Sequence, residues 1–317
     1  MAQFAFVFPG QGSQYVGMGK ALASASPAAA QTFNSADVVL DEPLSRLMFE
    51  GPAEQLDQTI NSQPAILTHS VALLRALGEQ VPTFYAGHSM GQYSAMVAAQ
   101  VISLADGLRL VRERGRQMQA SANDGAMAAI IGLPDDKVAD LEAVGRVAGQ
   151  FTIANRNSAG QIVVSGETAA VNAAAEAAKT LGAKRAIVLP VSVAAHSPLM
   201  TRAAEGMKRV LADVEFQNPR APLLANASAR PLTTAEECRA ELVEHLTRGV
   251  DWVAAVEYMT TQGVGSFVEV GPGKVLTGLI KRIAPEAQCV AVDDQSAPDG
   301  LAIPDFLPVN ATQGATA

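Results

Sequence analysis

Residues 85–96 read YAGHSMGQYSAM, and this stretch decides the fold class. It places Ser89 between two glycines, directly after a short apolar segment and before a run with helical character. Gly-x-Ser-x-Gly between a strand and a helix is typical of a nucleophile elbow. The glycines permit a sharp turn that a Cβ would obstruct, and the following helix directs its amide groups at negative charge near the serine. The stretch therefore predicts either a purely structural turn or a turn that presents a nucleophile.

The segments on both sides of this turn alternate between strand-like apolar runs and helix-like runs. This alternation predicts an α/β fold with a mainly parallel sheet, and the elbow within it predicts an α/β-hydrolase-like large domain. The strands are expected within 4–14, 83–89 and 265–273, and the helices within 92–103, 104–120 and 274–283.

The middle of the chain follows a different pattern, with strand, helix, hairpin, helix and strand in that order. This β-α-β-β-α-β order predicts a small ferredoxin-like domain, residues 125–190, inserted into the large one. The large domain would then comprise residues 1–124 and 191–293. Residues 294–317 are rich in Pro, Gly, Ala and Thr and predict a flexible tail.

The composition excludes several classes of protein. The net charge of −8 argues against nucleic acid as a partner, and no apolar run is long enough to cross a membrane. The first residues lack the basic segment of a secretory signal, and the two cysteines, Cys238 and Cys289, fit a reducing compartment. We therefore expect a cytoplasmic protein without a disulfide framework or a metal site.

A serine nucleophile needs a base, and the chain has four histidines. His88 adjoins Ser89 on the tight turn, where neighbouring side chains diverge, so it is interpreted as structural support. His69 lies in a helix-like run and is interpreted as an ordinary buried or surface histidine. His196 follows a strand at a predicted domain junction, where clefts form, and is the preferred base. His245 remains the second candidate.

Two further features bear on the site. The glycine loop at residues 9–14, PGQGSQ, ends a predicted strand and can supply a second oxyanion donor. The helix-like run 104–120 carries four arginines: Arg109 and Arg116 fall on its solvated face, whereas Arg112 and Arg114 flank its apolar stripe. Either of these two can reach inward, and periodicity does not choose between them.

From about residue 4 to 284 the chain resembles the malonyl-CoA:acyl carrier protein transacylases and related polyketide acyltransferase domains. The resemblance implies that Ser89 is the nucleophile, His196 the base, and that the backbone amides of Gln11 and Met90 form the oxyanion hole. It also implies that Arg114, rather than Arg112, grips a malonyl carboxylate. The matching motifs are FPGQGSQYVGMG, GHSMGQYSA, RLVRERGRQMQ, GAMAAIIGL, NRNSAGQIVVSG, AKRAIVLPVSVAAHSPLM and VEYMTTQGVGSFVEVGPGKVLTGLIKRI.

The chain departs from the family pattern at three places. Gln92 stands where the family usually has Glu, which removes a charge near the helix start. His245 stands where the family commonly has Gln; that residue orients the catalytic histidine through its backbone carbonyl, which any residue retains, but the histidine ring adds a titratable group expected to reshape the pH profile. The segment AAH before Ser197 differs where the family tunes acyl selectivity.

The resemblance implies ping-pong transfer of malonyl from a coenzyme A thioester to the phosphopantetheine thiol of an acyl carrier protein, without a cofactor. The alternatives are a trans-acting polyketide acyltransferase for malonyl or substituted malonyl, and an acyl hydrolase of the same fold. We expect a monomer whose acidic carrier docks on local cations. The candidates for this surface are Lys184, Arg185, Lys281 and Arg282.

Overall fold

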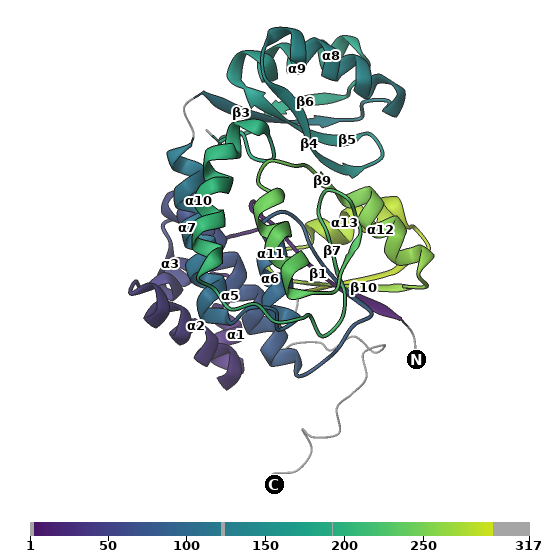
Figure 1. Cartoon of the computed structure of the whole chain (residues 1–317). Coiled ribbons are helices and arrows are strands. Elements are labelled where there is room, and N and C mark those ends of the chain that lie inside the picture. The colour runs from purple at the N-terminus through teal and green to yellow at the C-terminus, as the bar shows by residue number, and fades with distance from the viewer. Residues whose placement is uncertain (1–2, 122–123, 192, 294–317) are drawn as a thin grey trace.

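The structure is a computed structural model that describes residues 3–121, 124–191 and 193–293, which form two β-sheets surrounded by helices (Figure 1). The larger sheet lies in the body of the molecule, and the smaller one lies above it in Figure 1. The predicted tail, residues 294–317, lies outside the described residues.

The larger sheet has six strands in the order β11-β10-β1-β2-β7-β8. Its neighbours are parallel except for the last pair, β7 with β8, which is antiparallel. Strands β1, β2 and β10 are buried along their whole length, as expected for strands covered on both faces. The predicted parallel α/β architecture is thus confirmed. The strands are β1 (Phe4–Phe8), β2 (Phe84–Gly87), β7 (Leu223–Leu224), β8 (Pro231–Leu232), β10 (Ser266–Val270) and β11 (Gln288–Val292).

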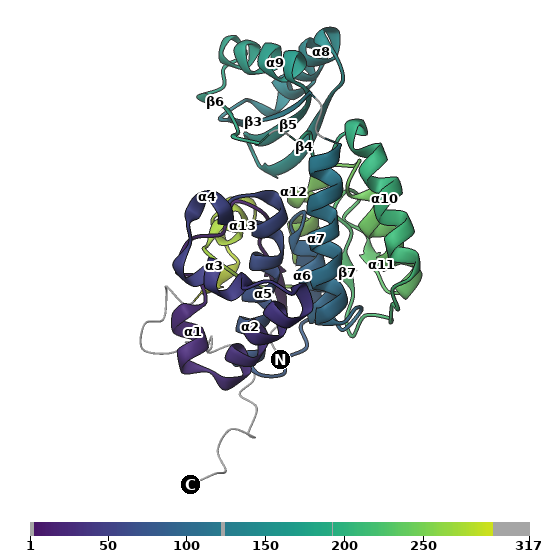
Figure 2. The same cartoon turned by 90° about the vertical axis from the view of Figure 1, so that its left-hand side faces the viewer.

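Helices pack on both faces of this sheet, because alternate side chains of each strand point to opposite faces. Phe6 and Phe8 of β1 belong to the cluster that includes residues of α2, α5 and α7, whereas Val7 belongs to the cluster with α12 and α13 (Figures 1 and 2). The helices are α1 (Lys20–Ala25), α2 (Pro27–Leu40), α3 (Leu44–Glu50), α4 (Ala53–Leu56), α5 (Thr59–Leu77), α6 (Gly91–Ala98), α7 (Leu104–Ala120), α10 (Thr201–Ala212), α11 (Ala235–Glu244), α12 (Trp252–Thr261) and α13 (Val275–Ile283).

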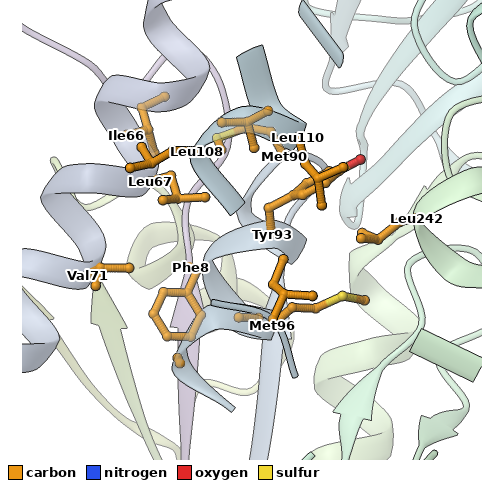
Figure 3. Packing of buried hydrophobic residues seen from close by; sticks show 14 of the residues in the cluster. Phe8, Ile66, Leu67, Val71, Met90, Tyr93, Met96, Leu108, Leu110 and Leu242 are labelled. Atoms are coloured by element: carbon orange, nitrogen blue, oxygen red, sulfur yellow. The ribbon is translucent and has the colours of Figure 1, made fainter. Parts of the chain in front are cut away.

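Helix α6, which follows the predicted elbow, is embedded in the core rather than laid on the surface. Figure 3 shows Met90, Tyr93 and Met96 between Leu67 of α5 and Leu242 of α11, and all five are buried. Full burial of side chains of this size contributes about 1.5–3 kcal/mol each. The start of α6 is therefore held in place by packing on two sides.

The smaller sheet has five strands in the order β6-β3-β5-β4-β9. Its first four strands and two helices occur in the predicted β-α-β-β-α-β order, with antiparallel pairing, and α8 and α9 contribute to the apolar cluster on one face. Unexpectedly, the short β9 from the later part of the chain pairs in parallel with β4. The exact domain boundaries stay predictions. The elements are β3 (Gly125–Ile131), α8 (Val138–Ala148), β4 (Phe151–Ser158), β5 (Gln161–Glu167), α9 (Thr168–Thr180), β6 (Arg185–Val188) and β9 (Val250–Asp251).

Two features are absent from residues 3–121, 124–191 and 193–293. None of their helices combines the length and the apolar character needed to cross a bilayer. Nor do these ranges bring together three or more His, Cys, Asp or Glu side chains in a way that would hold a metal ion.

Candidate active site

Ser89 occupies a strained turn between β2 and α6. Its φ of 53° lies in the left-handed region, which costs a non-glycine residue about 1–3 kcal/mol and clusters at functional sites. A Cβ on Gly87 would overlap the carbonyl carbon of Gly91, and a Cβ on Gly91 would overlap the carbonyl oxygen of Phe8. Both glycines are therefore required for this turn, which presents the serine side chain at the carboxyl end of a parallel strand.

His196 meets Ser89 although the two residues are 107 positions apart. The Oγ of Ser89 lies 2.8 Å from Nε2 of His196. On the other side of the ring, Nδ1 lies 2.6 Å from the carbonyl oxygen of His245 and 3.0 Å from that of Arg248. Carbonyl oxygens only accept, so the proton resides on Nδ1 and the Nε2 lone pair is free to accept the serine hydroxyl proton.

The surroundings keep this imidazole neutral. Burial, and next the positive charge of Arg114, lower the pKa of His196 to about 4, against the smaller opposing effect of the carbonyl contacts. The ring is therefore unprotonated at Nε2 near neutral pH. It is available as a general base before any substrate binds.

Arg114 of α7 places a guanidinium beside the same hydroxyl. Its Nη2 lies 3.4 Å from Ser89 Oγ, and only 2% of the residue is exposed. Burial lowers the pKa of Arg114, but guanidinium groups remain charged in proteins. Within residues 3–121, 124–191 and 193–293 it has no carboxylate partner, and its buried Nε has no hydrogen-bond partner. A buried cation in this condition favours an anionic ligand.

The structure also resolves the choice between the two inward candidates on α7. Arg112 lies toward the surface, where its guanidinium forms an ion pair with Glu42 at 2.7 Å and donates to Asn61 at 3.1 Å. Only Arg114 reaches the serine. Arg109 and Arg116 are about 60% exposed and pair with neighbouring carboxylates on their own helix, as periodicity predicts.

The two predicted oxyanion donors come from adjacent backbone segments. Met90 directly follows the serine, and Gln11 lies in the loop after β1. That loop packs against the elbow so closely that a Cβ on Gly10 would lie 2.6 Å from the carbonyl oxygen of His88. Within the described part of the chain, neither the Gln11 nor the Met90 amide donates to a protein acceptor. Their role as oxyanion donors stays a prediction that this placement supports.

The rings of His88 and His69, which the sequence analysis interpreted as non-catalytic, contact other residues instead of the serine hydroxyl. His88 Nε2 lies 2.9 Å from Oδ1 of Asn157, and its ring packs edge-on against Trp252. It thereby ties the elbow to β4 of the smaller sheet. His69 is fully buried in α5, 3.7 Å from Asp293.

The departures at positions 92 and 245 have structural explanations. The Gln92 side chain accepts from the Gly87 amide at 3.1 Å and donates to the Leu224 carbonyl at 2.9 Å, and a carboxylate could not donate the second bond. His245 orients His196 through its carbonyl, as expected. Burial, followed by the nearby charge of Arg114, lowers the pKa of the His245 ring well below 6.5, which argues against an effect of this ring on the pH profile near neutral pH.

Sequence reasoning missed two residues that hold the elbow. Asn226 accepts from the Ser89 amide and donates to the Gly87 carbonyl, both at 2.9 Å. Glu241 of α11 accepts from the Asn226 amide at 2.7 Å. The only available signal was that Asn226 follows a short apolar run, where side chains from the carboxyl end of a parallel strand reach the site.

The chain is similar to known proteins along almost its whole length. Residues 5–297 match the acyl transferase domain model. The malonyl CoA-acyl carrier protein transacylase of Escherichia coli K12 is 46% identical over 305 residues, which cover 94% of this chain and 98% of that protein.

Solved structures give the same result. An acyl carrier protein S-malonyltransferase from Vibrio cholerae superposes with a TM-score of 0.90 at 43% identity, covering 94% of this chain and 99% of the other. A malonyl-transacylase solved in complex with its type II polyketide acyl carrier protein has a TM-score of 0.89 at 42% identity, covering 94% and 98%.

Proposed function

The chain belongs to the malonyl CoA-acyl carrier protein transacylases, and from this premise we propose that Ser89 carries the malonyl group between its two thiol substrates. The family makes the chain an acyltransferase that moves malonyl from coenzyme A to acyl carrier protein. One observation carries the assignment of residues: the Ser89 hydroxyl lies 2.8 Å from Nε2 of His196 and 3.4 Å from the buried guanidinium of Arg114.

In the first half-reaction, Ser89 Oγ attacks the thioester carbonyl carbon while His196 Nε2 takes the hydroxyl proton. The Gln11 and Met90 amides stabilise the oxyanion of the tetrahedral intermediate. The carbon–sulfur bond then breaks, and the imidazolium returns its proton to the departing coenzyme A thiolate. Throughout, two N–H groups of Arg114 hold the malonyl carboxylate, which distinguishes malonyl from acetyl.

The second half-reaction reverses these steps with another thiol. His196 takes the proton of the phosphopantetheine thiol, whose sulfur attacks the Ser89 ester, and the proton passes to the Ser89 oxygen as the ester bond breaks. The chain's own residues supply the nucleophile, the base and the oxyanion donors. The proposed scheme therefore requires malonyl-CoA only as a substrate and no metal or redox cofactor.

The covalent intermediate is the direct test of this function. Incubation with radiolabelled malonyl-CoA should leave one labelled serine per chain, at Ser89, and transfer of that label to added acyl carrier protein should follow. Ser89→Ala should take up no label, whereas Ser24→Ala, a change at the surface of α1, should label normally. Equal labelling of Ser89→Ala would reject the scheme.

The predicted docking cations gather at one end of the smaller sheet. Arg185 lies across from Ile131, and Ile131 lies across from Gln161. Gln161 in turn accepts from Arg282 of α13 at 2.6 Å. All four cations, Lys184, Arg185, Lys281 and Arg282, are exposed. We propose that they attract the acidic carrier.

Charge reversal tests this surface. The double variant Lys281→Glu with Arg282→Glu should raise the KM for carrier severalfold without changing the labelling of Ser89. The matched control reverses Lys208 and Arg209, an exposed Lys-Arg pair on α10. An unchanged KM for carrier would place the docking surface elsewhere.

Product analysis separates the remaining alternatives. Carrier thioester identifies a transferase, whether the carrier serves fatty acid or polyketide synthesis, and free malonate identifies a hydrolase. A guanidinium reserved for a carboxylate argues against an editing hydrolase of neutral acyl groups. We further propose a cytoplasmic location, which fits the two free cysteines, Cys238 and Cys289. We also propose that the chain is a monomer, which a size measurement in solution can test.

A further inference from the structure

Asn226 uses all of its polar atoms to join three segments around the nucleophile. Its Oδ1 accepts from the amide of Ser89, and its Nδ2 donates to the carbonyl of Gly87, so one side-chain amide bridges both sides of the turn. Its backbone carbonyl accepts from the Asp251 amide at 2.8 Å. The residue is 4% exposed and touches neither Ser89 Oγ nor Arg114 through any hydrogen bond.

Glu241 holds Asn226 from the opposite side. Its Oε1 accepts a hydrogen bond from the backbone amide of Asn226 at 2.7 Å, and Glu241 is 6% exposed. Its backbone carbonyl accepts from the His245 amide at 3.0 Å within the last turn of α11. Glu241 therefore connects the elbow to the end of that helix.

The end of α11 also holds the base. The His196 amide donates to the Leu246 carbonyl at 3.0 Å, and His196 Nδ1 contacts the His245 carbonyl. The nucleophile and the base are thus aligned by one segment, α11 and the residues that directly follow it: through Glu241 and Asn226 on one side, and through the carbonyls of His245 and Leu246 on the other.

We propose that Asn226 and Glu241 are positioning residues for malonyl transfer, which hold the left-handed Ser89 turn in register with His196 through α11. This inference rests on the proposed function of Ser89. Neither residue touches the reacting atoms. Their loss should therefore slow acylation without weakening the binding of malonyl-CoA, because small misplacements of a nucleophile cost up to about a hundredfold in rate.

The environment of Glu241 adds a pH signature. Burial raises the pKa of this carboxyl to about 7, while the bond from Asn226 opposes the rise. Glu244 on the same helix raises the pKa further, and Arg230, which precedes β8, and Arg248 lower it. Burial, followed by the negative charges of Glu237 and Glu241, raises the pKa of Cys238, also on α11, to about 12. A hydrogen bond to the ionised carboxylate is stronger than one to the neutral acid. The bond from the Asn226 backbone amide to Glu241 should therefore strengthen as pH rises through about 7.

Asn226→Ala tests the link to the serine. Acylation reactions with radiolabelled malonyl-CoA, quenched at successive times, should show Ser89 labelled about ten- to a hundredfold more slowly than in the wild-type protein. The half-saturating malonyl-CoA concentration should stay within about twofold of the wild-type value. Asn34→Ala, on the exposed face of α2, is the matched control. A folded Asn226→Ala protein that acylates at the wild-type rate would overturn the inference.

Glu241 variants keep the question open to test even if Asn226→Ala does not fold. Glu241→Gln retains an acceptor oxygen and should acylate about two- to fivefold slower than wild type at pH 8 but equally fast at pH 6. Glu241→Ala removes the acceptor and should be slower at both pH values. The matched control is Glu236→Gln, a change at an exposed carboxylate in the first turn of the same helix, which should retain the wild-type step near pH 7.

A Glu241→Gln protein whose acylation rate changes between pH 6 and pH 8 as much as that of the wild type would contradict the role of Glu241. This rate step is measured from the release of p-nitrophenol from p-nitrophenyl acetate, whose acetyl group has no carboxylate. Absorbance is read at a wavelength where p-nitrophenol and its anion absorb equally, so that titration of the product does not imitate the step. The failures remain distinguishable: wild-type protein that never labels at Ser89 would refute the proposed function, whereas normal labelling with unaffected variants would refute only the positioning role.

Discussion

The two ends of the active site differ in how their buried polar atoms are satisfied. At the nucleophile end, both ring nitrogens of His196 and both side-chain polar atoms of Asn226 have partners. At the acyl end, Arg114 is equally buried, yet its Nε has no partner and its only hydrogen bond within the described chain is the 3.4 Å contact to Ser89.

This difference separates two tasks. The bonded end fixes the geometry of attack before substrate binds, so no reorganisation is required during the reaction. The unbonded end keeps a desolvated cation that has no carboxylate partner among the described residues, and in the proposed mechanism the malonyl carboxylate is that partner. In the proposed mechanism, catalytic geometry therefore depends on buried polar groups that have protein partners, and acyl selectivity depends on a buried cation that lacks one.

The largest effect is expected from breaking the bonded end at its turn. Gly87→Ala would drive a Cβ into the backbone of Gly91, where no flexible side chain can yield, so we expect loss of the native fold at 37 °C. The control is Gly278→Ala in α13, where a Cβ meets nothing within 4 Å and should raise the free energy of unfolding by up to about 1 kcal/mol. Thermal unfolding measures both, and a stable Gly87→Ala protein would disprove the steric argument.

The next effect concerns the unbonded end. Arg114→Met removes the clamp while keeping an apolar side chain of comparable length, and should slow acylation by malonyl-CoA at least about a hundredfold, since two charge-assisted hydrogen bonds are lost. The free protein should be no less stable than wild type, because an unpaired buried charge disappears. Acylation by acetyl-CoA serves as the internal control. A large fall in melting temperature, or equal losses with both substrates, would contradict the comparison.

The pH dependence of acylation sharpens the description of the base. Because His196 acts in its neutral form and its pKa is lowered to about 4, the rate should persist down to about pH 5 and fall tenfold per unit only below about 4. As the pH is lowered, the smaller decrease in acylation rate that we assign to Glu241 occurs first, near pH 7. The burst with p-nitrophenyl acetate measures this profile on protein whose folding is checked by circular dichroism. A main midpoint between 6 and 7 would show that His196 is not desolvated as described.

The smallest effect is expected at position 245. His245→Gln retains the backbone carbonyl that holds His196, and the buried ring of His245 is already neutral, so acylation should change by less than about threefold at every pH tested. Steady-state rates from pH 5 to 8 measure this. A displaced pH profile would assign the ring a role that its lowered pKa does not support.

Local patterns predicted much of the architecture. Alternating strand and helix signals predicted the parallel sheet, and the boundaries expected for α7 coincide with Leu104–Ala120 because its amphipathic pattern and its Ser103 cap are both local. The β9 strand was not predicted, since two residues carry no periodic signal and pair with β4 only after the chain has folded.

The site was less accessible to local reasoning. The Gly-x-Ser-x-Gly spacing identified Ser89, but periodicity left Arg112 and Arg114 equivalent. The choice between them depends on Glu42, which forms an ion pair with Arg112, and on Asn61, which accepts a hydrogen bond from it. The resemblance to a family pointed to Arg114, whereas the physical reason, a cation without a protein partner, is visible only in three dimensions.

By itself, the sequence determined the α/β class, the elbow that displays Ser89 and the set of four histidines from which a base could come, because these follow from neighbouring residues and from composition. The tertiary structure was needed to show which histidine lies within hydrogen-bond distance of the serine hydroxyl, which carbonyls set its tautomer, and how Asn226 reaches Ser89 across 137 positions. Such contacts depend on where separate strands end relative to one another, and this relation arises from packing of the whole chain rather than from any local pattern.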